Sequence, residues 1–526
     1  MKKTLTSIWN DAVSWQKKNK SEFYLLLIVI IVAAISRLYM ISSYMTFLGD
    51  EGRDVIIVRR LLVDFDPILV GPGTSIGNMY LGPLYYYMMA PALLLANFSP
   101  IGPAVMIALL GIFTVWFVWY LVREWFPAKS KTIHWGALVA AALYAVAPTI
   151  IIYSRSSWNP NIMPFFALLG VFSLWKVVKQ DNYKWMITLG ISLAGILQSH
   201  YLGLILFPVI AFFWLIKFFK VRKFTSERGS LMKQSVFGGI IFLLLMSPLV
   251  IFDARHGWRN FDAMKVFFTE RQTTVSARPW TAFPKIGDLS LQVNTSILGA
   301  HNETAGYVSN LLITVVLLYL VYRFLRDKHF GEFSLEYSIL IFWLGLALVG
   351  FGVYKQHIYD HYFGFLYPVP PLLIGGVFQR AWESKKKLIK YGFGAIIFYL
   401  LFVNLQNSPL QHPPNRQYER SVVVAEHIID ESDGKPFNFA VIAERNYEGA
   451  YQYHLERVNA DFVIIDPQRA DDTITEQLFV ICELPQEECD PTHNDKAEVA
   501  GFGWTVIEKQ WDVFGTTVYK LVHSEQ

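Results

Sequence analysis

In Thr46-Phe47-Leu48-Gly49-Asp50-Glu51-Gly52-Arg53-Asp54, two adjacent carboxylates are followed by an arginine and a third carboxylate. This polar stretch comes directly after an apolar segment that ends near Met45. Residues 55–63 are apolar on one side and carry Arg59 and Arg60 on the other, which predicts a short helix lying along a membrane surface. Carboxylates at this level can reach a molecule that is anchored in lipid.

Asp50 also has a purely structural interpretation. Asp is a favoured residue at helix N-termini, where its carboxylate accepts hydrogen bonds from free backbone N–H groups and faces the positive end of the helix dipole. The two interpretations of Asp50 stay open on this stretch alone, and the rest of the chain has to separate them.

The composition is that of a membrane protein with many spans. Of the 526 residues, 53% are hydrophobic and only 17% are charged, whereas soluble domains carry about 25% charged residues. The apolar residues come in runs of about 18 to 25, the length that crosses a bilayer. Residues 1–21 are polar and rich in lysine, which predicts a cytoplasmic tail rather than a cleavable signal peptide.

The positive-inside rule fixes the expected topology of the first loop. The first span is expected at residues 22–45, and residues 78–97 and 101–122 are the next apolar segments. If both crossed, every later basic loop would lie outside. We therefore expect residues 46–100 to form a first outer loop, in which residues 80–96 lie at the surface or insert only halfway.

With this choice the later loops separate by charge. The basic loops, which are expected inside, are residues 123–131, 176–184, 217–233, 323–328 and 380–390. The loops expected outside are residues 153–160, 198–201, 253–306 and 355–361. About eleven spans result, with the N-terminus inside and the C-terminus outside. An amphipathic segment is expected around residues 280–298 of the long outer loop 253–306.

The composition changes after the membrane domain, which is expected at residues 22–407. Residues 412–526 are predicted to form a small soluble α/β domain, with a helix at 422–429, strands at 437–442, 462–465 and 477–482, and a hairpin of 504–509 with 516–521. If this domain lies outside the cell, it is in an oxidising space, and Cys482 and Cys489 are predicted to form a disulfide.

Polar side chains recur on the outer face of several spans. Each has a plain interpretation, since arginine and lysine can extend to the interface and tyrosines form interfacial belts. Ionisable groups at membrane depth are nevertheless expensive and usually functional, and here they recur on one face of several spans. The set comprises Arg155, Asn159, His200, Tyr201, Asp253, Arg255, His256, Lys355, His357, Asp360, His361 and Tyr362.

The first loop resembles that of the GT-C glycosyltransferases. Asp50-Glu51-Gly52-Arg53 and the later Tyr80-Leu81-Gly82-Pro83-Leu84-Tyr85-Tyr86 carry this resemblance, together with His361-Tyr362 before the Pro368, Pro370 and Pro371 segment. The chain is similar to the protein O-mannosyltransferases and to the aminoarabinose transferases that modify lipid A, over residues 20 to 405. The resemblance implies an all-α, polytopic GT-C domain with surface helices in the first outer loop, an outward-facing active site and polyprenyl-phosphate sugar donors.

By this resemblance Asp50 is the candidate general base and Glu51 its neighbour for acceptor or metal. Substrate-binding candidates are Arg53, Tyr80, Tyr85, Arg155, Asn159, His200, Arg255, His256, Lys355, His361 and Tyr362. The chain departs from the aminoarabinose transferases at Leu81-Gly82, where they have Glu-Lys before the proline. That loss of a charged pair puts a zinc site in doubt, so a divalent metal is left open. An aspartate of the family is replaced by Asn159 and Asn161, and an arginine by His361.

The sequence therefore predicts a multi-pass enzyme of the cytoplasmic membrane with an extracytoplasmic active site. Its expected reaction moves a sugar, with inversion, from a polyprenyl-phosphate donor to a hydroxyl of a lipid, glycan or protein acceptor; no nucleic-acid partner is expected. Two alternatives remain, a lipid or sugar transporter and a non-catalytic membrane scaffold. A transporter tends to show internal repeats and polar groups near the midplane, whereas here the ionisable groups cluster at one surface.

Overall fold

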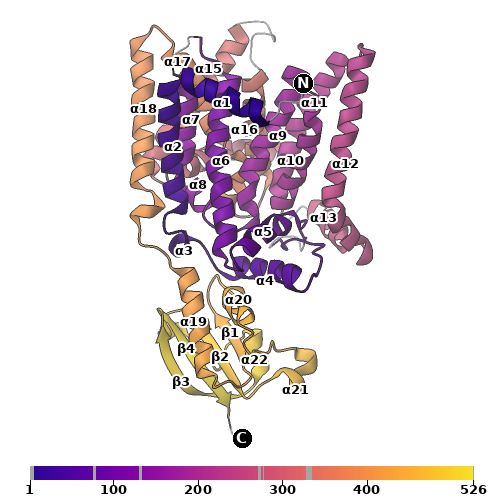
Figure 1. The fold of residues 1–526 in the computed structure, drawn as a ribbon, viewed down its shortest axis with the longest axis vertical. Coiled ribbons are helices and arrows are strands. Elements are labelled where there is room, and N and C mark those ends of the chain that lie inside the picture. Colours follow the sequence, from indigo (N-terminus) through magenta and orange to yellow (C-terminus); the bar gives the residue numbers. More distant parts are fainter. Residues whose placement is uncertain are drawn as a thin grey trace.

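A computed structural model describes residues 5–74, 79–129, 133–269, 274–276, 278–326 and 335–524. The chain forms a bundle of long helices and a smaller α/β domain that lies below one end of the bundle (Figure 1). The predicted fold class, an all-α membrane domain followed by a small α/β domain, is confirmed. Lys131 and Lys328, in two of the predicted basic loops, lie outside the described residues.

The bundle consists of apolar helices of unequal length. In the described part of the chain, eight helices are long and apolar enough to cross a membrane. They are α2 (Lys20–Leu38), α6 (Ile101–Trp125), α9 (Met163–Gln180) with the turn η1 (Asn159–Ile162), α11 (Leu206–Val221) with η2 (Tyr201–Ile205), α12 (Thr225–Arg255), α15 (Glu303–Arg326), α16 (Leu335–Val353) and α18 (Lys387–Gln406).

Shorter helices complete the bundle and its two ends. They are α1 (Leu5–Lys18), α3 (Ile41–Tyr44), α4 (Gly49–Val63), α5 (Leu84–Leu95), α7 (Trp135–Val146), α8 (Pro148–Ile152), α10 (Trp185–Ser199), α13 (Arg259–Thr269), η3 (Pro279–Lys285), α14 (Ile286–Ile297), η4 (Asp360–Leu366) and α17 (Val369–Trp382). The first predicted span is too long at its C-terminal end, because α2 stops at Leu38 and Met40 has a left-handed backbone before α3 begins.

The first loop lies at the end of the bundle nearest the α/β domain, whereas α1 lies at the opposite end (Figure 1). Helices α4 and α5 pack on each other there. At 12 residues, α5 rises about 18 Å, less than the roughly 30 Å of a bilayer core. The next helix long enough to cross is α6. The surface helix predicted after the polar stretch is therefore α4, and its first turn contains the two adjacent carboxylates.

The C-terminal domain is built on a four-stranded sheet of order β1-β2-β4-β3. Its elements are η5 (Pro409–Gln411), α19 (Gln417–Glu431), β1 (Asn438–Ile442), α20 (Gly449–Arg457), η6 (Pro467–Arg469), α21 (Ala470–Thr473), β2 (Gln477–Cys482), η7 (Gln486–Glu488), α22 (Ala497–Phe502), β3 (Thr505–Val513) and β4 (Thr516–His523). Strands β1 and β2 are parallel and wholly buried, because α19 and α20 cover one face of the sheet and α22 covers the other.

The predicted strand at residues 462–465 is wrong. Phe462 makes a single parallel bridge to Phe437, and no ladder continues from it. The reason is Asn438, whose side-chain amide donates to the carbonyls of Val463 and Thr473. The side chain of Asn438 thus takes the Val463 carbonyl, an acceptor that a strand at 462–465 would need. The predicted helix 422–429, the strands 437–442 and 477–482, and the terminal hairpin correspond to α19, β1, β2, and β3 with β4.

Candidate active site

The polar stretch folds as the first turn of α4, and Glu51 is the residue that caps it. The carboxylate of Glu51 accepts from the Leu48 N–H at 3.0 Å, and it is buried. This is the N3 half of a capping box. Asp50 makes no hydrogen bond to a backbone N–H of the described residues, so the helix-capping role considered for Asp50 belongs to its neighbour.

Asp50 instead forms an ion pair and accepts a hydroxyl hydrogen bond. Its Oδ1 lies 2.9 Å from Nη1 of Arg53 and 2.6 Å from the hydroxyl of Tyr447, which donates to it. Its side chain is 42% exposed. Both contacts are to Oδ1, so within the described residues Oδ2 has no hydrogen-bond partner and can accept a proton from a bound molecule.

Asp54 is the buried counterpart of Asp50. Arg53 donates to its Oδ1 through Nε and Nη2, and the Tyr86 hydroxyl donates to the same atom at 2.9 Å. Burial raises the pKa of Asp54 to about 6, opposed by the charge of Arg53. Burial also raises the pKa of Glu51 to about 7. One arginine thus pairs with two carboxylates, and Asp50 is the one that lines the cavity beside α4.

A cavity of about 620 Å³ opens beside Asp50. One part of its wall is polar and the other is apolar. The polar part includes Asp50, Arg53, Trp158, Asn159, His200, Tyr201, Tyr354, His361, Tyr362 and Tyr447, and the apolar part includes Leu202, Leu204, Ile205, Met264, Phe267, Val275 and Val353. The wall combines α4, η1, η2, α13, α16 and η4 with a loop of the C-terminal domain. The space suits an amphiphilic ligand.

Two histidines and several aromatic rings form one side of the cavity. The His361 ring lies 4.6 Å from that of Trp158, and the His200 ring lies 4.6 Å from that of Tyr362. Burial lowers the pKa of His361 to about 4, although the nearby Asp360 and Asp50 oppose the shift. Burial lowers the pKa of His200 to about 3. Burial thus favours the neutral form of both rings.

Six of the predicted site residues meet in this cavity. They are Asp50, Arg53, Asn159, His200, His361 and Tyr362. The remaining seven are not among the residues that line it. They are Glu51, Tyr80, Tyr85, Arg155, Arg255, His256 and Lys355.

Arg155 and the first-loop tyrosines hold elements together. Arg155 is buried, donates to the backbone carbonyls of Ser36 and Tyr39, and thereby attaches the segment after α8 to the end of α2. The hydroxyl of buried Tyr85 lies 2.6 Å from that of Ser157. The carbonyl of Tyr80 accepts from the Tyr201 hydroxyl, and its ring packs on Phe252.

The later basic candidates lie on exposed surface. Arg255 and His256 are exposed at the C-terminal end of α12, and His256 stacks on Phe252 with 4.1 Å between ring centroids. Lys355 is exposed as well, and its backbone N–H donates to Thr274. Its neighbour Tyr354, which the sequence analysis did not select, is the residue that reaches the cavity.

Tyr447 also lines the cavity, and like Tyr354 and Trp158 it was not among the site residues expected from the sequence. It lies 397 residues from Asp50 along the chain, in a domain without an assignable motif. No local signal in the sequence marks it. For the metal left open above, the described residues contain no group of three His, Cys, Asp or Glu side chains able to hold an ion.

Comparisons with known proteins agree with this architecture. Residues 81–252 match the family described as dolichyl-phosphate-mannose-protein mannosyltransferase. ArnT from Cupriavidus metallidurans bound to undecaprenyl phosphate superposes with a TM-score of 0.58 at 11% identity, covering 95% of this chain and 97% of that one. The apo state of the same ArnT gives 0.59 at 11% identity, with 97% and 98% covered.

Arabinofuranosyltransferase AftD from Mycobacteria is a more distant match, with a TM-score of 0.43 at 11% identity over 96% of this chain and 42% of that chain. No curated protein matches the chain by sequence. The likeness to ArnT extends over both the helical bundle and the C-terminal domain. The chain therefore has the GT-C glycosyltransferase fold of ArnT, and its residues 81–252 match the protein mannosyltransferase family.

Proposed function

We propose that this protein is a membrane glycosyltransferase that moves a sugar from a polyprenyl-phosphate donor to an acceptor hydroxyl. The observation that carries the proposal is the cavity beside Asp50, in which a half-exposed carboxylate and an apolar wall share one space. An amphiphilic donor matches that division of the wall. The family match and the fold support the same reaction class, and the related ArnT binds undecaprenyl phosphate.

The proposed chemistry is a single displacement. Oδ2 of Asp50 takes the proton of the acceptor hydroxyl, and the oxygen attacks the anomeric carbon as the bond from that carbon to the phosphate oxygen breaks. The products are the glycosylated acceptor and polyprenyl phosphate, and the anomeric configuration inverts once. Arg53 lines the cavity and supplies positive charge on the side of the leaving phosphate.

The aromatic side of the cavity is proposed to hold the sugar. Trp158, His361, His200 and Tyr362 present ring faces and neutral nitrogen and hydroxyl groups to the space. Asn159 lines the same side, but its amide donates to the Ser199 carbonyl at 2.7 Å. We therefore assign Asn159 to holding η1 beside α10, and the four rings to contact with the donor.

The test is sugar transfer by purified protein with a panel of polyprenyl-phosphate sugars, read out as release of polyprenyl phosphate. In single-turnover measurements Asp50→Asn should fold normally, still bind the donor and lose at least about a hundredfold in rate. Asp64→Asn is the matched control, because it makes the same chemical change at the exposed C-terminal end of the same helix. Near-parental transfer by Asp50→Asn would remove Asp50 as the base. Donor movement across vesicles without release of polyprenyl phosphate would favour a transporter.

A further inference from the structure

The C-terminal domain reaches the cavity through the loop between β1 and α20. Tyr447 of this loop donates its hydroxyl to Oδ1 of Asp50 at 2.6 Å and accepts from Nη1 of Arg53 at 3.2 Å. Its ring lies directly against Gly49, where an added Cβ would come within 2.4 Å of the ring. The contact is thus between the side chain of Tyr447 in the C-terminal domain and the backbone of Gly49 in the helical domain.

The neighbouring residue fixes this loop to α4. The side-chain oxygen of Asn446 accepts from the Gly49 N–H at 2.8 Å and from the Tyr447 N–H at 2.9 Å. The amide of Asn446 donates to Oε1 of Glu483 at 2.7 Å. Glu483 directly follows Cys482, which the structure joins to Cys489. The tyrosine is therefore held by contacts from both domains.

The two domains also meet backbone to backbone. An added Cβ on Gly52 of α4 would lie 2.1 Å from the carbonyl carbon of Gly449, at the start of α20. An added Cβ on Gly449 would lie 2.3 Å from the Gly49 carbonyl oxygen. At both glycines the backbone of one domain touches the backbone of the other, and no flexible side chain lies between them that could move aside. The docking of α20 on α4 therefore sets the position of Tyr447.

We infer that Tyr447 is a positioning residue of the transferase site, so that the C-terminal domain completes the active centre. The inference rests on the function proposed above. Tyr447 and Arg53 hold Oδ1 of Asp50 from two directions, which leaves Oδ2 as the oxygen directed to an acceptor hydroxyl. Without the tyrosine, only Arg53 would restrain the carboxylate, and fewer of its orientations would be productive.

The test is Tyr447→Phe, compared with Tyr453→Phe. Both substitutions remove one hydroxyl from the same domain interface, because Tyr453 donates to the Phe98 carbonyl, but Tyr453 does not line the cavity. Tyr447→Phe should lower kcat about tenfold or more, as expected for one hydrogen bond to a charged group. Its KM for the donor and its thermal unfolding temperature should match those of Tyr453→Phe, whose kcat should stay near the parental value.

The outcomes separate the two proposals. If Tyr447→Phe keeps parental kcat while Asp50→Asn is inactive, the positioning role is wrong and the function stands. If both tyrosine variants lose kcat equally, the effect is structural and the inference is overturned. If Asp50→Asn transfers sugar normally, the proposed base is wrong, whatever Tyr447 does.

A second variant tests the docking itself. Gly449→Ala should displace α20 from α4, seen as faster proteolysis between the domains, and should lower kcat at least as much as Tyr447→Phe. Faster proteolysis with parental turnover would show that the C-terminal domain is dispensable for the site and would overturn the inference.

Discussion

At the scale of single residues, the two adjacent carboxylates have opposite environments. Asp50 is half exposed at the cavity and paired with Arg53, whereas Glu51 is buried and turned back to the Leu48 N–H. Successive residues of a helix point about 100° apart, so a buried face and a cavity face can occupy neighbouring positions. The two adjacent carboxylates therefore have different roles: Asp50 is the candidate base, and Glu51 caps the helix.

The buried state of Glu51 predicts a pH-dependent stability. Burial raises the pKa of Glu51 from 4.5 to about 7, so the unfolded chain loses this proton at a lower pH than the folded protein. The contribution of Glu51 to stability is therefore greatest below its pKa in the unfolded chain, and it falls as the pH rises toward its pKa in the folded protein. Glu51→Gln should therefore unfold at a higher temperature than the parent at pH 8 and at nearly the same temperature at pH 4. The reverse order would contradict the burial of a protonated carboxyl.

The same variant bears on catalysis. Because Glu51 does not line the cavity, Glu51→Gln should retain most of the transfer rate, whereas Asp50→Asn should not. A loss as severe as that of Asp50→Asn would indicate that Glu51 holds a metal or the acceptor, as the sequence analysis allowed.

At the scale of elements, α5 decides how the chain is threaded. Helix α5 is apolar and, at 12 residues, shorter than the roughly 20 that usually cross a bilayer, and it packs on α4 at the end of the bundle that holds the cavity. Helix α6 then runs to the opposite end, where the N–H of Lys129 donates to Glu383 just beyond α17. Lys355 lies near the cavity, bonded to Thr274. Lys129 and the cavity are thus at opposite ends of the bundle.

The threading predicts which positions an impermeant thiol reagent can reach. In a background without Cys482 and Cys489, a cysteine in place of Lys355 should be labelled in intact cells. A cysteine in place of Lys129 should be labelled only after the membrane is permeabilised. Labelling of position 129 from outside would mean that α5 crosses and that the orientation expected from the basic loops is inverted.

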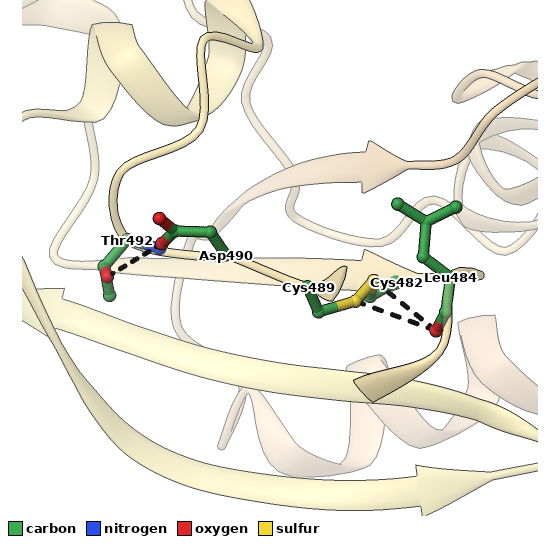
Figure 2. The surroundings of a disulfide bond; sticks show 5 residues. All are labelled: Cys482, Leu484, Cys489, Asp490 and Thr492. Carbon is green, nitrogen blue, oxygen red and sulfur yellow. Dashed lines mark hydrogen bonds between the residues drawn. A yellow bond between two sulfur atoms is a disulfide. The ribbon is translucent and has the colours of Figure 1, made fainter. Parts of the chain in front are cut away.

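At the scale of the whole molecule, the C-terminal domain is both a separate fold and a part of the cavity wall. Its sheet has its own core on each face, while its β1–α20 loop reaches Asp50. Figure 2 shows the disulfide between Cys482 and Cys489, whose two sulfur atoms lie 3.9 and 3.8 Å from the Leu484 carbonyl oxygen. The bridge closes the turn that follows β2, next to Glu483.

The disulfide is itself testable. Protein purified without reductant should resist alkylation and gain the mass of two hydrogens on reduction, because both thiols are joined. Its loop spans a sequence separation of only 7, so reduction should lower stability modestly, since short loops remove little chain entropy. Two alkylated thiols in unreduced protein would contradict the bridge and the oxidising location that predicts it.

Much of this protein follows from local sequence. Apolar runs of bilayer length give the helical bundle, and the polar stretch around Asp50 gives α4, because hydrophobic length and amphipathic period act within one segment. The change in composition after residue 407 and the regular strand patterns give the α/β domain. The strand predicted at residues 462–465 does not form, because the side chain of Asn438, 25 residues earlier, donates to the Val463 carbonyl.

Only the tertiary structure decides which candidate residues line the cavity and which hold helices together. In the sequence, the arginines, tyrosines and histidines of the predicted outer loops are equally good candidates for the site. In the folded protein, Arg155 is buried and donates to backbone carbonyls, whereas Arg255 is exposed. Folding also brings Tyr447 to Asp50 across 397 residues. The pattern of apolar residues along one segment indicates which face of that helix or strand is buried. Which polar side chains meet in one cavity depends on how separate helices and domains pack against one another, and no local pattern contains that information.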